Sequence, residues 1–292
     1  MKLIVKKMVQ VIIPIAHNNH YFPKKDFYFP KPLVEVAGHP MIVQVVKDRE
    51  RRLNIDKLIF VLPRSLENEF SLASILKLNT KVPTSIVLRD ENNSGGLCSS
   101  LMAIDELNQS NPVIVMNMDE ILNINLQTIV DKFIEKRASA GLISFSSTHP
   151  RWCYAITDNQ FVKSCTEKKV VSKEALAGFY FFKNKEIFVQ SASQAMLDDD
   201  QCDGKYYLSA AINQIILRGD KVLHEEIQSN NYFSFFSPEM IREFETSSYS
   251  EVISKKIRSS VASVNVVIPA AGDGSRFAKE RWKAPKPFID IN

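Results

Sequence analysis

Glycine is scarce in this sequence of 292 residues. There are nine glycines, about 3% of the chain, where globular proteins usually have ~7%. Two of the nine, Gly272 and Gly274, lie among the last 30 residues. A function that depends on glycine-rich loops is therefore difficult to place in the first 262 residues.

The sequence also lacks paired cysteines and long apolar runs. Its four cysteines are widely spaced and form no CxxC pair, so we expect reduced thiols in a cytoplasmic protein, without a disulfide framework or a zinc site. No run approaches the ~18 apolar residues of a membrane span. The basic and then apolar start has a proline and no small-residue cleavage site, so we interpret residues 9–15 as a buried strand rather than part of a signal peptide.

Charge is balanced, with 37 basic and 33 acidic residues and a net charge of +4. The balance gives no indication of a nucleic-acid or membrane partner and is compatible with small anionic ligands. At 45% hydrophobic and 24% charged residues, the composition is that of a globular protein large enough to bury a substantial core.

Apolar, β-rich segments alternate with helical patterns in the first half of the chain, which predicts a parallel sheet built from βαβ units. The expected strands are 9–15, 57–63, 84–90, 111–121 and 140–147, and the expected helices are 39–53, 65–77, 96–107 and 126–139. After His149 the pattern changes to hairpins, a late helix and closing strands, at 153–168, 175–184, 206–219, 222–227 and 231–237. The polar, serine-rich stretch 242–262 predicts a terminal helix and a linker.

The segments 9–40 and 264–292 have the same layout: an apolar strand, a loop and Pro-Lys-Pro. A repeat spaced by roughly 255 residues indicates tandem duplication of whole domains. About 29 residues cannot form a core. We therefore expect a domain at 1–245, a linker at 246–262 and the incomplete start of a second domain at 263–292. A tail that adds a functional loop to the first domain is the alternative.

The late copy reads VVIPAAGDGSRF and has the chemistry of a phosphate-binding loop. Gly272 and Gly274 allow the backbone to approach a phosphate, while Arg276 and then Lys286 supply positive charge. Strand, AAGDGSRF and Pro-Lys-Pro together resemble the opening signature of the sugar nucleotidyltransferases. Matching segments continue in order over residues 9–245 and are most similar to bacterial nucleoside-diphosphate-sugar pyrophosphorylase-like proteins of surface-polysaccharide pathways.

This resemblance implies an α/β, three-layer Rossmann-like mixed sheet of the glycosyltransferase-A type. It also implies that a nucleoside triphosphate and a sugar 1-phosphate react to give a nucleotide-sugar and pyrophosphate. The implied site consists of Lys31 for phosphate, Gly95 and Gly96 for the base, Asp119 for Mg²⁺, Glu167 and Gly178 for the sugar, and Lys168 for the sugar phosphate. A solvated acid, an ordinary turn and a surface ion pair are the structural alternatives, and Glu120 could substitute for Asp119.

The first copy departs from the family pattern in its phosphate loop. His17 and Asn19 fill the glycine positions, and Tyr21 stands at the arginine. Loss of a charge-clamping arginine typically costs on the order of 10³-fold in phosphoryl chemistry. A metal site at His17 and His20 would lack an evident third ligand. The aromatic segment 21–29 could pack a lid loop or stack on a ligand.

A second departure lies at 233–239, where Ser234 replaces a metal-binding aspartate and Phe236 replaces a glycine. Two hypotheses follow. Either the chain is an enzyme whose activity resides mainly in the second domain, or the first domain is a non-catalytic module that binds sugar phosphate or nucleotide-sugar. The departures favour the second for residues 1–245. A glycosyltransferase is a weaker alternative because NMDEI is a poor DxD motif. A homo-oligomer is compatible with the resemblance.

Overall fold

The computed structural model describes residues 7–16, 21–23, 25–91 and 94–250. They belong to a compact unit that extends to Glu251, and residues 252–292 form a separate unit. The late-copy residues Gly272, Gly274, Arg276 and Lys286, together with His17, Asn19 and His20, lie outside the described residues.

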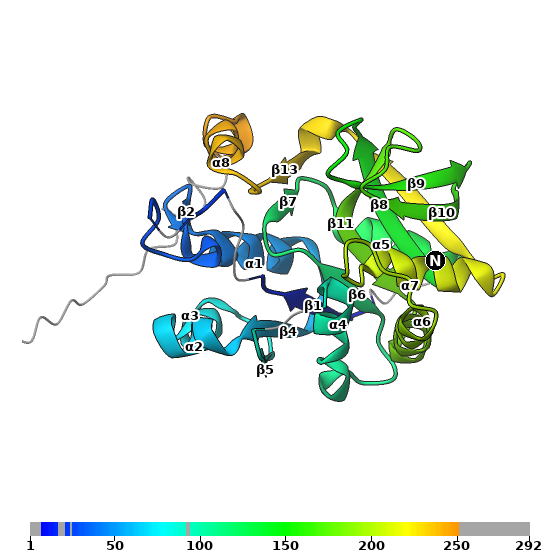
Figure 1. The fold of residues 1–292 in the computed structure, drawn as a ribbon, viewed down its shortest axis with the longest axis horizontal. Coiled ribbons are helices and arrows are strands. Elements are labelled where there is room, and N and C mark those ends of the chain that lie inside the picture. The colour runs from blue at the N-terminus through cyan, green and yellow to red at the C-terminus, as the bar shows by residue number, and fades with distance from the viewer. Residues whose placement is uncertain (1–6, 17–20, 24, 92–93, 251–292) are drawn as a thin grey trace, which may run out of the picture. The chain divides into compact units, whose positions relative to one another are not determined.

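A nine-stranded mixed sheet forms the centre of the fold, in the order β5-β4-β1-β6-β11-β8-β12-β10-β9 (Figure 1). Its first four strands are parallel, as the βαβ pattern predicted. They are β1 (Val9–Pro14), β4 (Ile55–Pro63), β5 (Thr84–Arg89) and β6 (Val113–Met116). Val9 and Val11–Ile13 of β1 are completely buried because the strand lies between two neighbours and is covered on both faces.

The other half of the sheet begins with β11, which runs antiparallel to both β6 and β8. β12 pairs parallel with β8, and β10 pairs antiparallel with both β12 and β9. β11 also pairs with β9, so these five strands close on one another. They are β8 (Ala140–Ser146), β9 (Cys153–Asp158), β10 (Phe161–Glu167), β11 (Glu174–Phe182) and β12 (Val222–Ile227).

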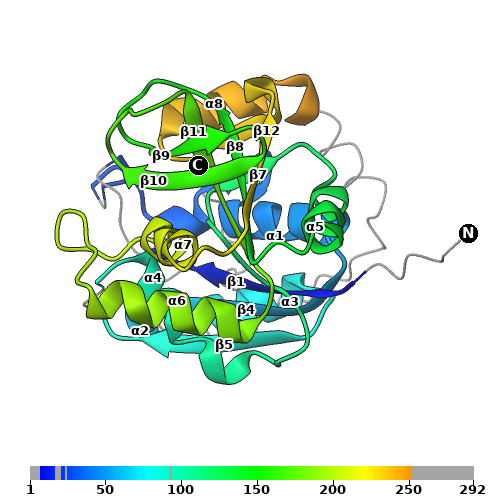
Figure 2. The same cartoon turned by 90° about the vertical axis from the view of Figure 1, so that its right-hand side faces the viewer.

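Helices cover both faces of the sheet and produce the expected three layers (Figure 2). Alternate side chains of β1 separate the two cores: Val11 and Ile13 belong to one cluster and Ile12 to the other. The first core includes residues of α1 (Met41–Arg52), α2 (Arg64–Phe70), α3 (Leu72–Asn79) and α5 (Leu126–Glu135). The second includes residues of α4 (Gly96–Leu101), α6 (Lys185–Leu197) and α7 (Leu208–Leu217).

Several element boundaries differ from the sequence predictions. The single helix expected at 65–77 is two helices, because Ser71 adopts a left-handed backbone with φ 51°. The helix expected at 96–107 ends at Leu101, and a 3₁₀ turn, η2 (Ile104–Glu106), follows. The strand expected at 111–121 is divided into β6 and β7 (Glu120–Leu122), because the chain turns at 117–119.

Short elements complete the described chain. β7 pairs with β13 (Tyr232–Ser234), and β2 (Glu35–Val36) pairs with β3 (His39–Pro40). The remaining elements are η1 (Lys31–Leu33), η3 (Ser229–Asn231) and α8 (Pro238–Glu245). No helix in the described ranges is long and apolar enough to cross a membrane.

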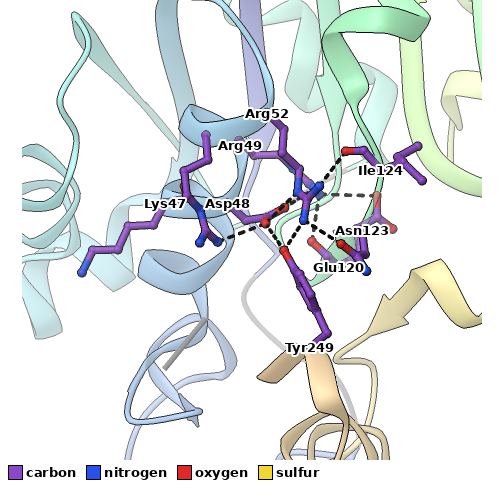
Figure 3. A network of polar contacts seen from close by, with 9 residues as sticks. Lys47, Asp48, Arg49, Arg52, Glu120, Asn123, Ile124 and Tyr249 are labelled. Carbon is purple, nitrogen blue, oxygen red and sulfur yellow. Dashed lines mark hydrogen bonds and ion pairs between the residues drawn. The ribbon is translucent and has the colours of Figure 1, made fainter. Parts of the chain in front are cut away.

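The last described residues pack closely against α1, although we expected the linker to begin at residue 246. The Tyr249 hydroxyl lies 2.8 Å from Oδ1 of Asp48 and also contacts the Arg52 guanidinium (Figure 3). The Tyr249 ring stacks on Phe233 with centroids 5.7 Å apart, and Ser250 is buried. Residues 246–250 are therefore part of the compact unit.

Candidate functional site

A cavity of about 500 Å³ opens at the carboxyl ends of the parallel strands, where parallel sheets generally bind their ligands. Residues that follow β1 and β6 contribute to it directly. Its lining consists of Pro14, Ile15, Ala16, Arg89, Glu91, Gly95, Gly96, Ser99, Asn117, Lys205 and Tyr207. Of the residues that the sequence singled out for binding, this cavity includes Gly95 and Gly96.

Lys31 and Asp119, which are 88 positions apart in the chain, form an ion pair. Lys31 lies in η1 and is only 5% exposed, so it is neither solvated nor open to a phosphate. Asp119 lies three residues beyond the end of β6, and its side chain is 21% exposed. Lys31, which the sequence predicted to bind phosphate, thus neutralises Asp119, which the sequence predicted to bind a metal.

Aromatic rings surround this ion pair. The Lys31 ammonium lies 5.8 Å from the ring centre of Phe22 and 5.5 Å from that of Phe236. Tyr21 packs on Phe236 with centroids 5.0 Å apart. Tyr21 and Phe236 occupy the arginine and glycine positions of the two departures, so substitutions far apart in the sequence form one contact. We call Tyr21, Phe22 and Phe236 the aromatic cap.

Arg151 connects the aromatic cap to the hairpin half of the sheet. Its guanidinium lies 5.2 Å from the Phe236 ring and 4.1 Å from the Trp152 ring, within cation–π range. Trp152 in turn packs against Phe145 and Tyr232. The cap is therefore supported by the loop before β9.

Glu120 does not substitute for Asp119, because its side chain is buried in a polar network (Figure 3). Its carboxylate accepts hydrogen bonds from Asn117 Nδ2 and the Tyr232 hydroxyl, both at 3.2 Å. Arg49 Nη2 lies 3.9 Å from Glu120 Oε1 and donates to the Glu120 carbonyl at 2.8 Å. Burial raises the pKa of Glu120 to about 8, with Arg49 opposing the shift.

Gly178 makes room for this network. Its φ is +61°, and a Cβ there would lie 2.1 Å from Asn117 Nδ2 and 2.4 Å from Glu120 Oε1. The Gly178 carbonyl accepts a hydrogen bond from the Asn117 amide at 3.2 Å. The requirement for glycine at position 178 thus comes from the close approach of β11 to the end of β6.

Gly95 has a comparable role beside the cavity. Its φ is +118°, and a Cβ would lie 2.2 Å from the carbonyl oxygen of Tyr206. The Tyr206 amide donates to the Ser94 carbonyl, and the Leu97 amide donates to the Tyr206 carbonyl. Gly95 lets these main chains meet, whereas a Cβ on Gly96 would have nothing within 4 Å. The structure therefore gives Gly95 a packing function and leaves Gly96 open to the cavity.

Glu167 lies in a second, smaller cavity of about 200 Å³. Its carboxylate accepts a hydrogen bond from Ser209, and burial raises its pKa. Lys168 forms an ion pair with Asp203 at 2.6 Å, and the hydrogen bond to Asp203 raises the Lys168 pKa. Tyr207 lines both cavities, and the Lys168 ammonium lies 5.6 Å from its ring centre. The Glu-Lys pair is thus placed beside the larger cavity, behind Tyr207.

Sequence reasoning singled out neither the charged lining residues of the larger cavity nor two polar ones: Arg89, Glu91, Lys205, Asn117 and Tyr207. Asn117 could have been found from its position just before Asp119 at the end of a predicted strand. Tyr207 opens a helix that the sequence predicted, but its placement depends on how that helix packs. Lys205 lies in an exposed turn with no pattern of its own.

The donor set around Asp119 provides a test for the expected Mg²⁺. Ser234, at the position of the second metal-binding aspartate, is buried and offers no charge. The described residues contain no group of three His, Cys, Asp or Glu side chains that could hold a metal ion. With Asp119 paired to Lys31 and Glu120 directed into the buried network, these residues do not fit a Mg²⁺ pair.

Comparisons with known proteins agree with the fold described above. The nucleotidyl transferase family model matches residues 27–226. A nucleoside-diphosphate-sugar pyrophosphorylase from Vibrio cholerae RC9 has a similar structure, with TM-score 0.69, 16% identity and coverage of 80% of this chain and 98% of that one. An inositol-1-phosphate CTP transferase from T. maritima gives TM-score 0.67, 11% identity and coverage of 88% and 99%.

A third similar structure is a putative glucose-1-phosphate thymidylyltransferase from Bacillus anthracis in complex with a sucrose. Its TM-score is 0.62 and its identity 16%, and the match covers 88% of this chain and 98% of that one. At these identities the structural matches establish the fold alone. A search among curated proteins finds no match to the sequence.

Proposed function

Since the chain belongs to the nucleotidyl transferase family, we propose that residues 7–250 bind a nucleotide-sugar or a related phosphate ligand without transferring a nucleotidyl group. The cavity of about 500 Å³ at the carboxyl ends of β1 and β6 has the position and size for such a ligand. Gly96 leaves space in which a ligand could approach the backbone, and Tyr207 adds an aromatic ring to the lining.

The observation that carries this proposal is the ion pair between Lys31 and Asp119 beneath the aromatic cap. Phosphoryl transfer depends almost entirely on positioning anions and screening their charge. Here the expected phosphate lysine and the expected metal ligand are bound to each other, and the Phe236 ring, packed on Tyr21, lies over the lysine ammonium. A triphosphate or a metal would have to compete with this ion pair for either group.

Mg²⁺ has no step in this proposal, because the residues around Asp119 do not fit a Mg²⁺ pair and Asp119 is bound to Lys31. Binding is accordingly expected to be independent of Mg²⁺. We also place the protein in the cytoplasmic metabolism of nucleotide-sugars that the resemblance implies. The tandem duplication and a homo-oligomeric state remain predictions.

The family's reaction is the competing function. In it, a sugar-1-phosphate oxygen attacks the α-phosphate of a nucleoside triphosphate and pyrophosphate leaves. The position of Asp119 after β6 favours this function, because parallel sheets hold catalytic groups at that edge. The two functions differ in whether the chain releases pyrophosphate.

We would measure pyrophosphate release by the full chain with four nucleoside triphosphates and a panel of sugar 1-phosphates, in the presence of Mg²⁺. We expect no release above background, while calorimetry detects binding of a nucleotide-sugar or sugar phosphate more tightly than of free triphosphate. Asp119→Asn is the control. Release that disappears in this variant would refute the proposal.

Restoring the family residues makes the test sharper. Tyr21→Arg, Ser234→Asp and Phe236→Gly together remove two of the three rings of the aromatic cap and add a carboxylate. If the cap and the missing ligand block transfer, this triple variant should bind Mg-triphosphate more tightly than the original chain. A triple variant that folds and binds Mg-triphosphate no better would show that the cap is not what excludes it.

A further inference from the structure

We infer that Lys205 is the cation that binds the phosphate of the ligand in the larger cavity. This inference rests on the proposed function and deepens it, because it assigns the charge that the altered phosphate loop no longer supplies. Lys205 lines the cavity and its residue is exposed. It stands in the turn before α7, outside the segments that the resemblance marks for phosphate binding.

The two lysines expected to meet phosphate are both engaged elsewhere. Lys31 is buried in its ion pair with Asp119. Lys168 is bound to Asp203 at 2.6 Å and faces the Tyr207 ring. Neither lines the larger cavity. A phosphate bound there therefore needs another positively charged partner.

Among the residues that the structure describes, three charged ones line this cavity: Arg89, Glu91 and Lys205. Arg89 is only 5% exposed, and its Nη1 and Nη2 atoms donate to the backbone carbonyls of Asp90, Glu91 and Ile15. Its guanidinium thus holds the ends of β1 and β5 together. The Lys205 ammonium has no hydrogen bond or ion pair with the described residues, so it can reach a ligand without breaking an existing contact.

Main-chain bonds fix the position from which Lys205 extends. The Cys202 amide donates to the Lys205 carbonyl at 2.9 Å, and the Lys205 amide donates to the Cys202 carbonyl at 3.1 Å. The next residue, Tyr206, is bonded through its backbone to the Gly95 loop. Asp203, in the same turn, is tied to Lys168. The turn from 202 to 205 is therefore anchored on both sides, and only the lysine side chain has to adjust to the phosphate.

The test is calorimetric titration of the full chain with ATP, GTP, CTP, UTP, UDP-glucose and GDP-mannose, followed by the unphosphorylated nucleoside of the tightest ligand. For that ligand, Lys205→Gln should weaken binding about tenfold, equivalent to about 1.4 kcal/mol. Binding of the nucleoside should not change. The dependence of affinity on salt should also decrease, because one phosphate contact is lost. Lys205→Arg should retain affinity within about threefold, since the charge remains.

Lys221→Gln is the matched control. Lys221 is an exposed lysine that precedes β12, in the other half of the sheet, and it donates to the Lys136 carbonyl. Equal affinities of the original chain and Lys205→Gln would overturn the assignment while leaving the proposed function intact. Pyrophosphate release that depends on Asp119 would overturn the non-catalytic function and leave the Lys205 result to be judged separately. If the original chain binds none of these six ligands and none of the sugar 1-phosphates of the pyrophosphate assay, both are wrong.

Discussion

The ring of Tyr21 packs on the ring of Phe236, with centroids 5.0 Å apart and planes inclined by 59°. Each residue stands where the family pattern has a different one: arginine at position 21 and glycine at 236. Taken separately, the two changes are losses from a phosphate site. Their contact shows that the two replacement rings also pack on each other, and the Phe236 ring lies 5.5 Å from the Lys31 ammonium that pairs with Asp119.

The first prediction concerns the energetic coupling between Tyr21 and Phe236. Phe236→Ala should lower the free energy of unfolding by about 1–3 kcal/mol, because the ring is partly buried and packs on two cations. In a double-mutant cycle with Tyr21→Ala, we expect a coupling of about 0.5–1.5 kcal/mol, measured by urea unfolding. A cycle between Tyr21→Ala and Phe188→Leu should give additive effects, because Phe188 packs on Phe182 in the second core. Additive effects of Tyr21→Ala and Phe236→Ala would contradict the packing of these two rings on each other.

Gly178→Ala is the second prediction. The added methyl would meet Asn117 and Glu120 at under 2.6 Å and would also require φ +61°. We expect the free energy of unfolding to fall by about 2–4 kcal/mol. Gly219→Ala separates the two causes, because Gly219 has φ +80° and open space around its Cβ position. The control should cost only about 1 kcal/mol. Equal losses of unfolding free energy in the two variants would mean that the cost of Gly178→Ala comes from backbone strain alone, with no contribution from the contacts with Asn117 and Glu120.

The third prediction is a pH dependence that comes from Glu120. Burial raises its pKa to about 8 in the folded protein, above the ordinary 4.5, so folding takes up a proton between these values. The contribution of Glu120 to stability is therefore fully present below pH 4.5 and is lost as pH rises toward 8. Urea unfolding of the original chain and Glu120→Gln from pH 5 to 9 checks this.

The stability of the original chain relative to Glu120→Gln should decline across that pH range, by at most about 1.4 kcal/mol per pH unit. Glu239→Gln, on the exposed surface of α8, is the matched control. The difference in unfolding free energy between this variant and the original chain should stay nearly constant from pH 5 to 9. A difference for Glu120→Gln that rises with pH would show that Arg49 keeps the carboxylate ionised.

Tyr249→Phe is the fourth prediction. The hydroxyl contacts Asp48 and Arg52, and removing it leaves the buried Asp48 carboxylate with fewer partners. We expect a loss of about 1–2 kcal/mol in the free energy of unfolding. Tyr28→Phe, at a ring that is 88% exposed, should have no measurable effect. If Tyr249→Phe leaves the free energy of unfolding unchanged, the stacking of the ring on Phe233 is sufficient to hold residues 246–250 in place.

The sequence predicted the sheet well because strand periodicity and buried β-branched residues are local signals. β1, β4, β8 and β12 lie where their apolar runs predicted them. α6 was missed, since its buried face is made largely of small residues, Ser191, Ala192 and Ala195, which give little helical periodicity.

The candidate site was predictable as a set of residues but not as a set of contacts. Lys31 and Asp119 were both singled out, yet nothing in the sequence shows that they bind each other instead of a ligand. The same holds for Tyr21 and Phe236, which the sequence marks as departures from the family pattern, with Tyr21 also in the aromatic segment 21–29, without showing that their rings meet. Lys205 gave no signal, because an exposed lysine in a polar turn is common and its function depends on where the fold places that turn.

Main-chain hydrogen bonds make up much of the frame around the larger cavity: Tyr206 to the Gly95 loop, Asn117 to Gly178, and the Phe235 amide to the Asp119 carbonyl. Such bonds do not depend on which side chains the residues have, apart from the glycines that let the backbones meet. The shape of the cavity can therefore persist while substitutions change the side chains that line it. A protein built in this way can lose a reaction through a few substitutions and keep a pocket in which another recognition task can evolve.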